Sequence, residues 1–347
     1  MFETTDPAAR NDAIELLRGL AALAVALVHL TFGFARYVDR RIPETAAATD
    51  IGQTAVAAFF VVSGAVMVLA AGPRASRATA PTTFWLRRAI RVLPPYWIAS
   101  GLFAVVLLWL GQVPPIDEVM RSAAFVPPSQ DAELPFLPVL WPGWTLAFEL
   151  VFYLVFGACL FAGRARAVGL CGGVLLVLVV TGWSAQPEHY ALRLVTAPHL
   201  LLFVAGLGFG TFLARGRRVP GAVRIVAMLV GFAAMAIMPN AWPWPITAGL
   251  PGVCVFIGIA GGPLPSHCSK VARVAGAASY ALYLLHVPFA HAWTRIFIRY
   301  VGEPGGSLGF LATGVPVLLI LAWSFHRWIE RPMVNSLYRS IGVARRA

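Results

Sequence analysis

The chain has little charge for its length. Charged residues make up 12% of its 347 residues, Lys270 is the single lysine, and 59% of the residues are hydrophobic. A soluble domain needs far more charge to cover its surface. The composition therefore excludes an ordinary soluble protein. Apolar runs long enough to cross a bilayer recur along the whole chain and indicate a polytopic membrane protein.

Cysteine is also scarce. The four cysteines are Cys159, Cys171, Cys254 and Cys268, and none forms a CxxC pair. Three of them lie within apolar runs, where a small buried thiol is common. The spacing supports neither a disulfide framework nor a metal site, and we expect no bound metal.

The excess of basic residues does not indicate a nucleic-acid-binding protein. The formal net charge is +12, yet the basic residues lie in short loops between apolar segments and form no stripe with aromatic residues. The enrichment of arginine and lysine in cytoplasmic loops explains them instead. We expect membrane lipids as partners and no nucleic acid.

Ten apolar segments predict an all-α membrane protein with about ten transmembrane helices. The N-terminal stretch MFETTDPAARND has no cleavable signal pattern, so we expect the first apolar run to be a retained helix. An even number of helices places both termini on one side of the membrane. The predicted helices are residues 13–34, 51–71, 92–111, 143–162, 168–182, 195–214, 221–238, 245–261, 275–298 and 308–328.

The distribution of basic residues predicts that this side is the cytoplasm. Of the 27 basic residues, 20 fall in the N-terminal segment, the even-numbered loops or the C-terminal tail, and the cluster of Arg36, Arg40 and Arg41 is the clear exception. We expect cytoplasmic tails at 1–12 and 333–347 and a transmembrane domain at 13–332. Its long outer loop, residues 112–142, is rich in proline and acidic residues and is either functional or a solvated linker.

The first predicted helix carries ionisable side chains inside an apolar run. In ELLRGLAALAVALVH, Arg18 lies near the cytoplasmic end and His29 in the outer half. Eleven residues at about 100° each place both on one face, about 16 Å apart along the axis. Since ionisable groups within a span usually face a polar cavity, we interpret this face as the wall of an internal path. Alternatively, Arg18 pairs with Glu15 at the interface and His29 makes one interhelical hydrogen bond.

Arginines precede the third predicted helix. In RRAIRVLPPYW, Arg88 and Arg91 share one face before a proline pair, a fork that suits phosphate groups. The alternative is a plain positive anchor at the cytoplasmic surface. The segment HRWIERPM at the end of the last helix is interpreted as such an anchor.

Two further helices carry polar faces. In WTLAFELVFYL, Glu149 is costly to bury unless it is paired or protonated, and we place it at the depth of His29, with Thr145 and Tyr153 on the same face. The polar positions of SYALYLLH include Tyr280, Tyr283 and His286. These side chains either take part in the activity of the protein or form hydrogen bonds between helices.

This arrangement predicts a group-transfer site. A phosphate-bearing donor would be held from the cytoplasm by arginines. A histidine assisted by a glutamate would activate an acceptor hydroxyl deeper in the membrane.

Taken in order, these segments resemble the integral-membrane acyltransferase family 3, whose members acylate bacterial surface sugars and related acceptors. The matching residues are LRGLAALAVALVH, FFVVSG, RRAIRVLPPYW, WTLAFELVFYL and SYALYLLH, spread over about residues 12–332. The resemblance implies a ten-helix core in the bacterial cytoplasmic (inner) membrane. It also implies acyl-CoA, commonly acetyl-CoA, as cosubstrate, with no bound cofactor.

The resemblance also implies site roles. It assigns the catalytic histidine to His29, the functional carboxylate to Glu149 with Thr145 in the hydroxyl position, and the donor-associated arginines to Arg18, Arg88 and Arg91. The acceptor would be a sugar hydroxyl of an exopolysaccharide, lipopolysaccharide or lipid-linked oligosaccharide, with Glu149 orienting His29 or sharing its proton. The alternatives are a proton-coupled transporter, for which the sequence shows no internal repeat, and a lipid-linked glycosyltransferase.

Overall fold

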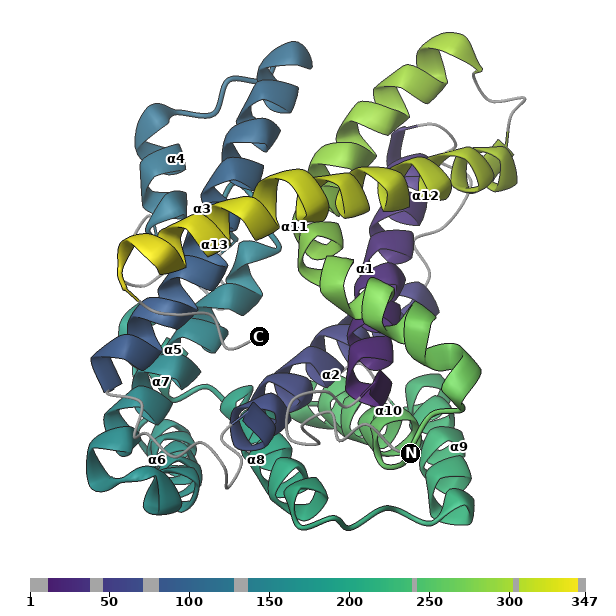
Figure 1. Ribbon diagram of the computed structural model, residues 1–347. Coiled ribbons are helices and arrows are strands. Elements are labelled where there is room, and N and C mark those ends of the chain that lie inside the picture. Colours follow the sequence, from purple (N-terminus) through teal and green to yellow (C-terminus); the bar gives the residue numbers. More distant parts are fainter. Residues whose placement is uncertain are drawn as a thin grey trace.

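The computed structural model describes residues 12–37, 46–70, 81–127, 137–238, 242–301 and 306–342, and every regular element in these ranges is helical (Figure 1). The α-helices are α1 (Asp12–Tyr37), α2 (Ala46–Ala70), α3 (Pro81–Trp109), α4 (Ile116–Ala123), α5 (Gly143–Cys159), α6 (Arg164–Ala185), α7 (Tyr190–Val195), α8 (Leu200–Ala214), α9 (Gly221–Ile237), α10 (Leu250–Ala260), α11 (Ser269–Tyr300), α12 (Gly306–Phe325) and α13 (Arg331–Ser340). Short 3₁₀ or π segments are η1 (Leu160–Ala162), η2 (Pro245–Gly249), η3 (Ser266–Cys268) and η5 (His326–Glu330).

Seven helical stretches in the described ranges are long and apolar enough to cross a membrane, which confirms a polytopic helical membrane protein. The remaining three predicted segments are also helical. They correspond to α9, to η2 with α10, and to α11, which is long but carries more polar residues. The predicted tail 1–11 and the outer arginines Arg40 and Arg41 lie outside the described residues.

Helix α3 begins eleven residues before the predicted start at 92. Pro81 occupies its first turn, where a missing backbone N–H costs nothing, and Pro94 and Pro95 lie within the helix rather than before it. Transmembrane helices tolerate interior proline because neighbouring helices satisfy the nearby backbone groups. Tyr280 of α11 also contacts this part of α3, where its hydroxyl donates to the Val92 carbonyl at 2.8 Å. Arg88 and Arg91 therefore project from a helix, not from a loop.

The end of the chain also differs from the prediction. Residues 331–340, mostly assigned to a tail, form α13, which continues α12 through the π segment η5. Figure 1 shows this continuous helix lying across α11 and α3, both of which it contacts. At about 1.5 Å per residue its 35 residues exceed a bilayer core of about 30 Å, so part of it lies beyond the core.

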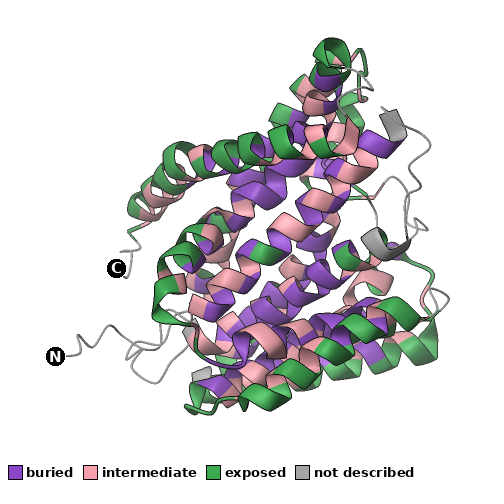
Figure 2. Ribbon diagram, turned by 90° about the vertical axis from the view of Figure 1, so that its right-hand side faces the viewer, coloured by how far each residue is buried: buried purple, intermediate pink, exposed green. Residues whose placement is uncertain are grey.

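The centre of the molecule is formed by α1, α2, α8 and α11. Helix α1 packs along α11 and α2, and α2 packs on α8, where Gly64 and Gly206 let the two backbones touch. The most apolar stretch of α2 is 72% buried, whereas that of α6 is 22% buried. The large apolar residues exposed on α6 include Val177 and Trp183, and such side chains suit contact with lipid tails. Figure 2 shows exposed residues on the outer sides of the helices and buried residues on the sides that face other helices.

The described parts of the predicted outer loop are folded onto the bundle. The short helix α4 docks on α3 through Tyr96, whose hydroxyl donates to the Ser122 carbonyl at 3.2 Å. The Ser122 hydroxyl in turn accepts a bond from the Val139 N–H at 2.9 Å. These bonds hold the residues that lead into Trp141 and α5 against the bundle.

Candidate active site

Two cavities that contain charged side chains lie beside the N-terminal half of α1. The first, about 330 Å³, lies among α1, α2, α3, α5 and α11; the second, about 480 Å³, lies among α1, α3, α11 and α13. Glu15, Arg18, Arg91 and Tyr280 line both. We call the joined space the arginine chamber.

The arginine chamber carries an excess of positive charge. Its arginines outnumber its glutamates five to three, and its second cavity includes exposed side chains. The arginines are Arg18, Arg88, Arg91, Arg273 and Arg331, and the glutamates are Glu15, Glu149 and Glu330. Guanidinium groups bind phosphate in a bidentate manner, so the chamber suits a phosphate-bearing ligand that enters from the exposed side.

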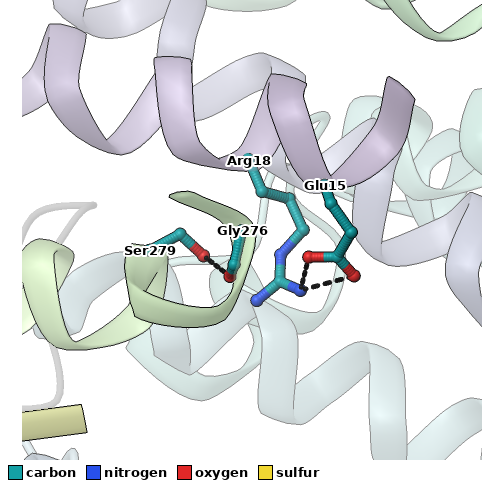
Figure 3. A network of polar contacts seen from close by, with 4 residues as sticks. All are labelled: Glu15, Arg18, Gly276 and Ser279. Carbon is teal, nitrogen blue, oxygen red and sulfur yellow. Dashed lines mark hydrogen bonds and ion pairs between the residues drawn. The ribbon is translucent and has the colours of Figure 1, made fainter. Parts of the chain in front are cut away.

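Arg18 is held where α1 crosses α11 (Figure 3). Its guanidinium group pairs with the Glu15 carboxylate at 3.2 Å, and Gly276 of α11 lies directly against Glu15. Beside it, the Ser279 hydroxyl donates to the Gly276 carbonyl at 2.7 Å. Arg18 thus makes the ion pair that the alternative interpretation expected and also lines both parts of the arginine chamber.

Glu149 is at the centre of a second polar group in the chamber. Its carboxylate accepts a bond from the Ser63 hydroxyl at 3.1 Å and another from the Tyr153 hydroxyl. It also attracts the guanidinium groups of Arg18 and Arg91. Arg88 lies over the Tyr153 ring, 5.2 Å from its centroid. This group fixes the wall of the chamber formed by α2, α3 and α5.

His29 lines a third cavity of about 290 Å³, the His29 cavity, between α1, α2 and the start of α5. One ring nitrogen of His29 lies 2.9 Å from the Val25 carbonyl, and its ring packs edge-on against Trp141 at 4.7 Å. A neutral imidazole that donates one N–H to a carbonyl keeps its second nitrogen as an acceptor. In that form, the second ring nitrogen of His29 can accept a proton.

His286 of α11 lies beside His29. Their ring centroids are 4.9 Å apart, and His286 is completely buried, with one nitrogen 2.7 Å from the Tyr283 carbonyl. Its other nitrogen has no hydrogen-bond partner within the described part of the chain. A buried imidazole nitrogen left in this state is costly, which points to a role for His286 beyond packing.

Tyr283 lies where the two spaces meet. It lines both the first cavity of the arginine chamber and the His29 cavity, as does Val56. Its hydroxyl lies 2.8 Å from the Thr145 hydroxyl and 3.2 Å from the Pro142 carbonyl. Arg18 and His29 both face α11, as their spacing predicted, and Tyr283 lies between their levels.

Contrary to what the sequence had led us to expect, the structure does not bring Glu149 into contact with His29. The two side chains line different cavities, and among the described residues no contact joins them. From the sequence we placed Glu149 at the same depth in the membrane as His29. That placement assumed that the fourth predicted helix begins level with the outer end of α1. In the fold α5 instead places Glu149 next to the arginines. Glu149 belongs to the arginine chamber.

Some lining residues were not predicted from the sequence. Arg273, Arg331 and Tyr338 line the second cavity, although the first two were interpreted as positive-inside charges and Tyr338 was placed in a tail. His199 lines the His29 cavity, although it was assigned no role. Only the crossing of distant helices brings these residues to the site, so no local motif could have indicated them.

Comparisons with known proteins identify the family of the chain. The acyltransferase domain of the acyltransferase 3 family matches residues 11–327. The exopolysaccharide production protein ExoZ of Rhizobium meliloti (strain 1021) is 30% identical over 82% of this chain and 90% of its own length. The acyltransferase MdmB of Streptomyces mycarofaciens is 25% identical over 94% of this chain and 92% of its own length. No solved structure gives a significant match. The chain is a membrane acyltransferase that belongs to the acyltransferase 3 family.

Proposed function

We propose that this enzyme is an O-acyltransferase that moves an acyl group, most simply acetyl, from acyl-CoA to a sugar hydroxyl of an extracellular or lipid-linked glycan. The observation that carries the proposal is that a basic chamber and a histidine cavity meet at Tyr283. The relative named as an exopolysaccharide production protein supports a glycan as acceptor. The proposed location is the bacterial cytoplasmic membrane, with the chain termini in the cytoplasm.

The arginine chamber would hold the donor. The CoA phosphates would bind Arg18, Arg88 and Arg91, and the flexible pantetheine arm would extend past Tyr280 towards Tyr283. Glu149 keeps this wall in place through Ser63 and Tyr153. Its role in this proposal is to position the donor site, and His29 alone acts as the base.

The transfer itself would occur on the Tyr283 side of the His29 cavity. His29 takes the proton of the acceptor hydroxyl as the oxygen attacks the thioester carbonyl. The C–S bond breaks, an ester C–O bond forms, and the proton then passes from His29 to the departing CoA thiolate. His286, 4.9 Å from the His29 ring, would support the base or the acceptor.

A direct test compares the surface glycans of a strain with and without the gene by mass spectrometry. We expect the glycan to lose the mass of one acetyl group per modified residue in the deletion strain. The wild-type gene should restore it, and the His29→Ala gene should not. Identical glycan masses in all strains would contradict the proposed acceptor. Flux of a substrate across vesicles without an acyl donor would favour the alternative of a proton-coupled transporter.

A further inference from the structure

The His29 cavity contains a group of aromatic and polar side chains that the donor site does not use. Three tryptophans line it, Trp141, Trp144 and Trp244, and its polar side chains include Gln53 and His199. No arginine or lysine is among its described lining residues. The cavity therefore differs in chemistry from the arginine chamber on the other side of Tyr283.

His199 and Trp244 form a fixed stack in this cavity. Their ring centroids are 4.3 Å apart, and the opposite face of His199 stacks on Phe148 at 4.6 Å. The Trp244 indole N–H donates to the Gln53 side-chain oxygen at 2.6 Å. Because an indole N–H can only donate, the atom it meets must be the amide oxygen, and the Gln53 amide group keeps its two N–H donors for another partner.

This combination suits a sugar ring. A pyranose presents patches of C–H groups that pack on flat aromatic faces, and hydroxyl groups around its edge that need donors and acceptors. A fatty acyl chain would leave the polar side chains unpaired, at a cost in free energy. A phosphate group would find no cation here. The volume of about 290 Å³ is enough for one ring rather than for a folded chain.

We propose that the His29 cavity is the acceptor subsite and binds one pyranose unit between Trp244, Trp144 and Gln53, with its reactive hydroxyl towards His29. This inference rests on the proposed function, because it gives the acceptor a place on the far side of Tyr283 from the donor. His199 would hold the Trp244 ring in place by stacking on it. The Gln53 amide would donate a hydrogen bond to a hydroxyl of the pyranose.

The test uses purified enzyme in lipid nanodiscs, acetyl-CoA as donor, and oligosaccharides cut from the glycan of the deletion strain as acceptor. Trp244→Ala and Gln53→Ala should raise the KM for the oligosaccharide about tenfold or more and change the KM for acetyl-CoA by no more than about twofold. Trp244→Phe keeps one aromatic face and should give an intermediate value. The matched control is Trp183→Ala, since Trp183 is exposed on the outer face of α6. Thermal unfolding of each variant separates a binding defect from a folding defect.

Three outcomes would overturn the acceptor subsite. In the first, the oligosaccharide KM of Trp244→Phe and Gln53→Ala stays within about twofold of wild type. In the second, both KM values rise together. In the third, Trp244→Ala accepts longer acyl-CoA donors with an unchanged acceptor KM, which would place the acyl chain here.

A separate measurement keeps this test independent of the proposed function. The same oligosaccharides are titrated without acetyl-CoA while tryptophan fluorescence is recorded. We expect a saturable change in wild type, and Trp244→Ala should shift its midpoint to an oligosaccharide concentration about tenfold higher or more. If wild type binds the sugar but transfers no acetyl group, the proposed function fails and the subsite stands. If wild type transfers acetyl groups and the fluorescence change is the same in Trp244→Ala, the subsite fails alone.

Discussion

The hydroxyl of Tyr283 in α11 lies 2.8 Å from the hydroxyl of Thr145 in α5, at the point where the arginine chamber meets the His29 cavity. Both hydroxyls also reach the Pro142 carbonyl, Thr145 at 3.0 Å and Tyr283 at 3.2 Å. This triangle ties the first turn of α5 to the middle of α11. The triangle therefore sets the distance between α5 and α11 at the boundary between the two cavities. An acyl thioester would have to reach this boundary.

Tyr283→Phe should weaken this tie without removing the ring. Thr145 keeps its bond to Pro142, so we expect a loss of about 0.5–1.5 kcal/mol in the free energy of unfolding. Thr145→Val is the partner variant, and the double variant should show a coupling of similar size in detergent unfolding. Tyr300→Phe is the control, since Tyr300 is exposed. Strictly additive effects would show that the two hydroxyls act independently.

His29→Ala should abolish transfer and leave the protein inserted. Loss of a general base typically lowers the rate by about 10²–10⁴-fold. The rate is measured as acetyl transfer by purified protein, with size-exclusion chromatography as the check on folding. His267→Ala, in the short segment η3, is the control and should be fully active. Full activity of His29→Ala would remove His29 from the mechanism.

Arg91→Lys and Arg88→Lys should weaken donor binding. An ammonium group keeps the charge but loses the bidentate fork, so we expect the KM for acetyl-CoA to rise about tenfold or more. Arg87→Lys is a matched control, because Arg87 is on the same helix and is not among the residues that line the chamber. An equal rise for Arg87→Lys would mean that the effect is not specific to the arginines that line the chamber.

Glu149→Gln distinguishes a donor-site residue from a partner of His29. The amide cannot hold Arg18 and Arg91 by charge, so we expect the KM for acetyl-CoA to rise about tenfold with little change in the acceptor KM. Ser63→Ala, which removes one bond to the carboxylate, should have a smaller effect. A loss confined to kcat at saturating donor, with a shifted pH profile, would instead assign Glu149 to the base.

Gly276→Ala tests the contact of α11 with Glu15. A Cβ at this position would overlap the Glu15 side chain and backbone, so we expect a destabilisation of about 1–3 kcal/mol and a raised donor KM. Gly173→Ala in α6 should have the opposite sign, a stabilisation of about 0.4–1 kcal/mol, because open space surrounds Gly173. Equal stability of the two variants would contradict the close packing at Gly276.

The sequence by itself determined the class of protein and which side chains share one face of α1. Apolar length is a local property, so all ten predicted segments are helical. The spacing of Arg18 and His29 follows from helix geometry alone, and both do face α11. The start of α3 was misjudged because a proline pair normally ends a helix in a soluble protein, whereas a transmembrane helix tolerates proline in its interior.

Only the tertiary structure decided which side chains share a cavity. Glu149 lies with the arginines and His199 with His29, because the relative depth of two helices depends on loops and packing that hydropathy does not encode. Tyr283 and Thr145 are 138 positions apart, and their hydroxyls meet because α5 and α11 converge at Pro142. Helix periodicity orders residues along one face, whereas the crossing of helices sets which faces meet.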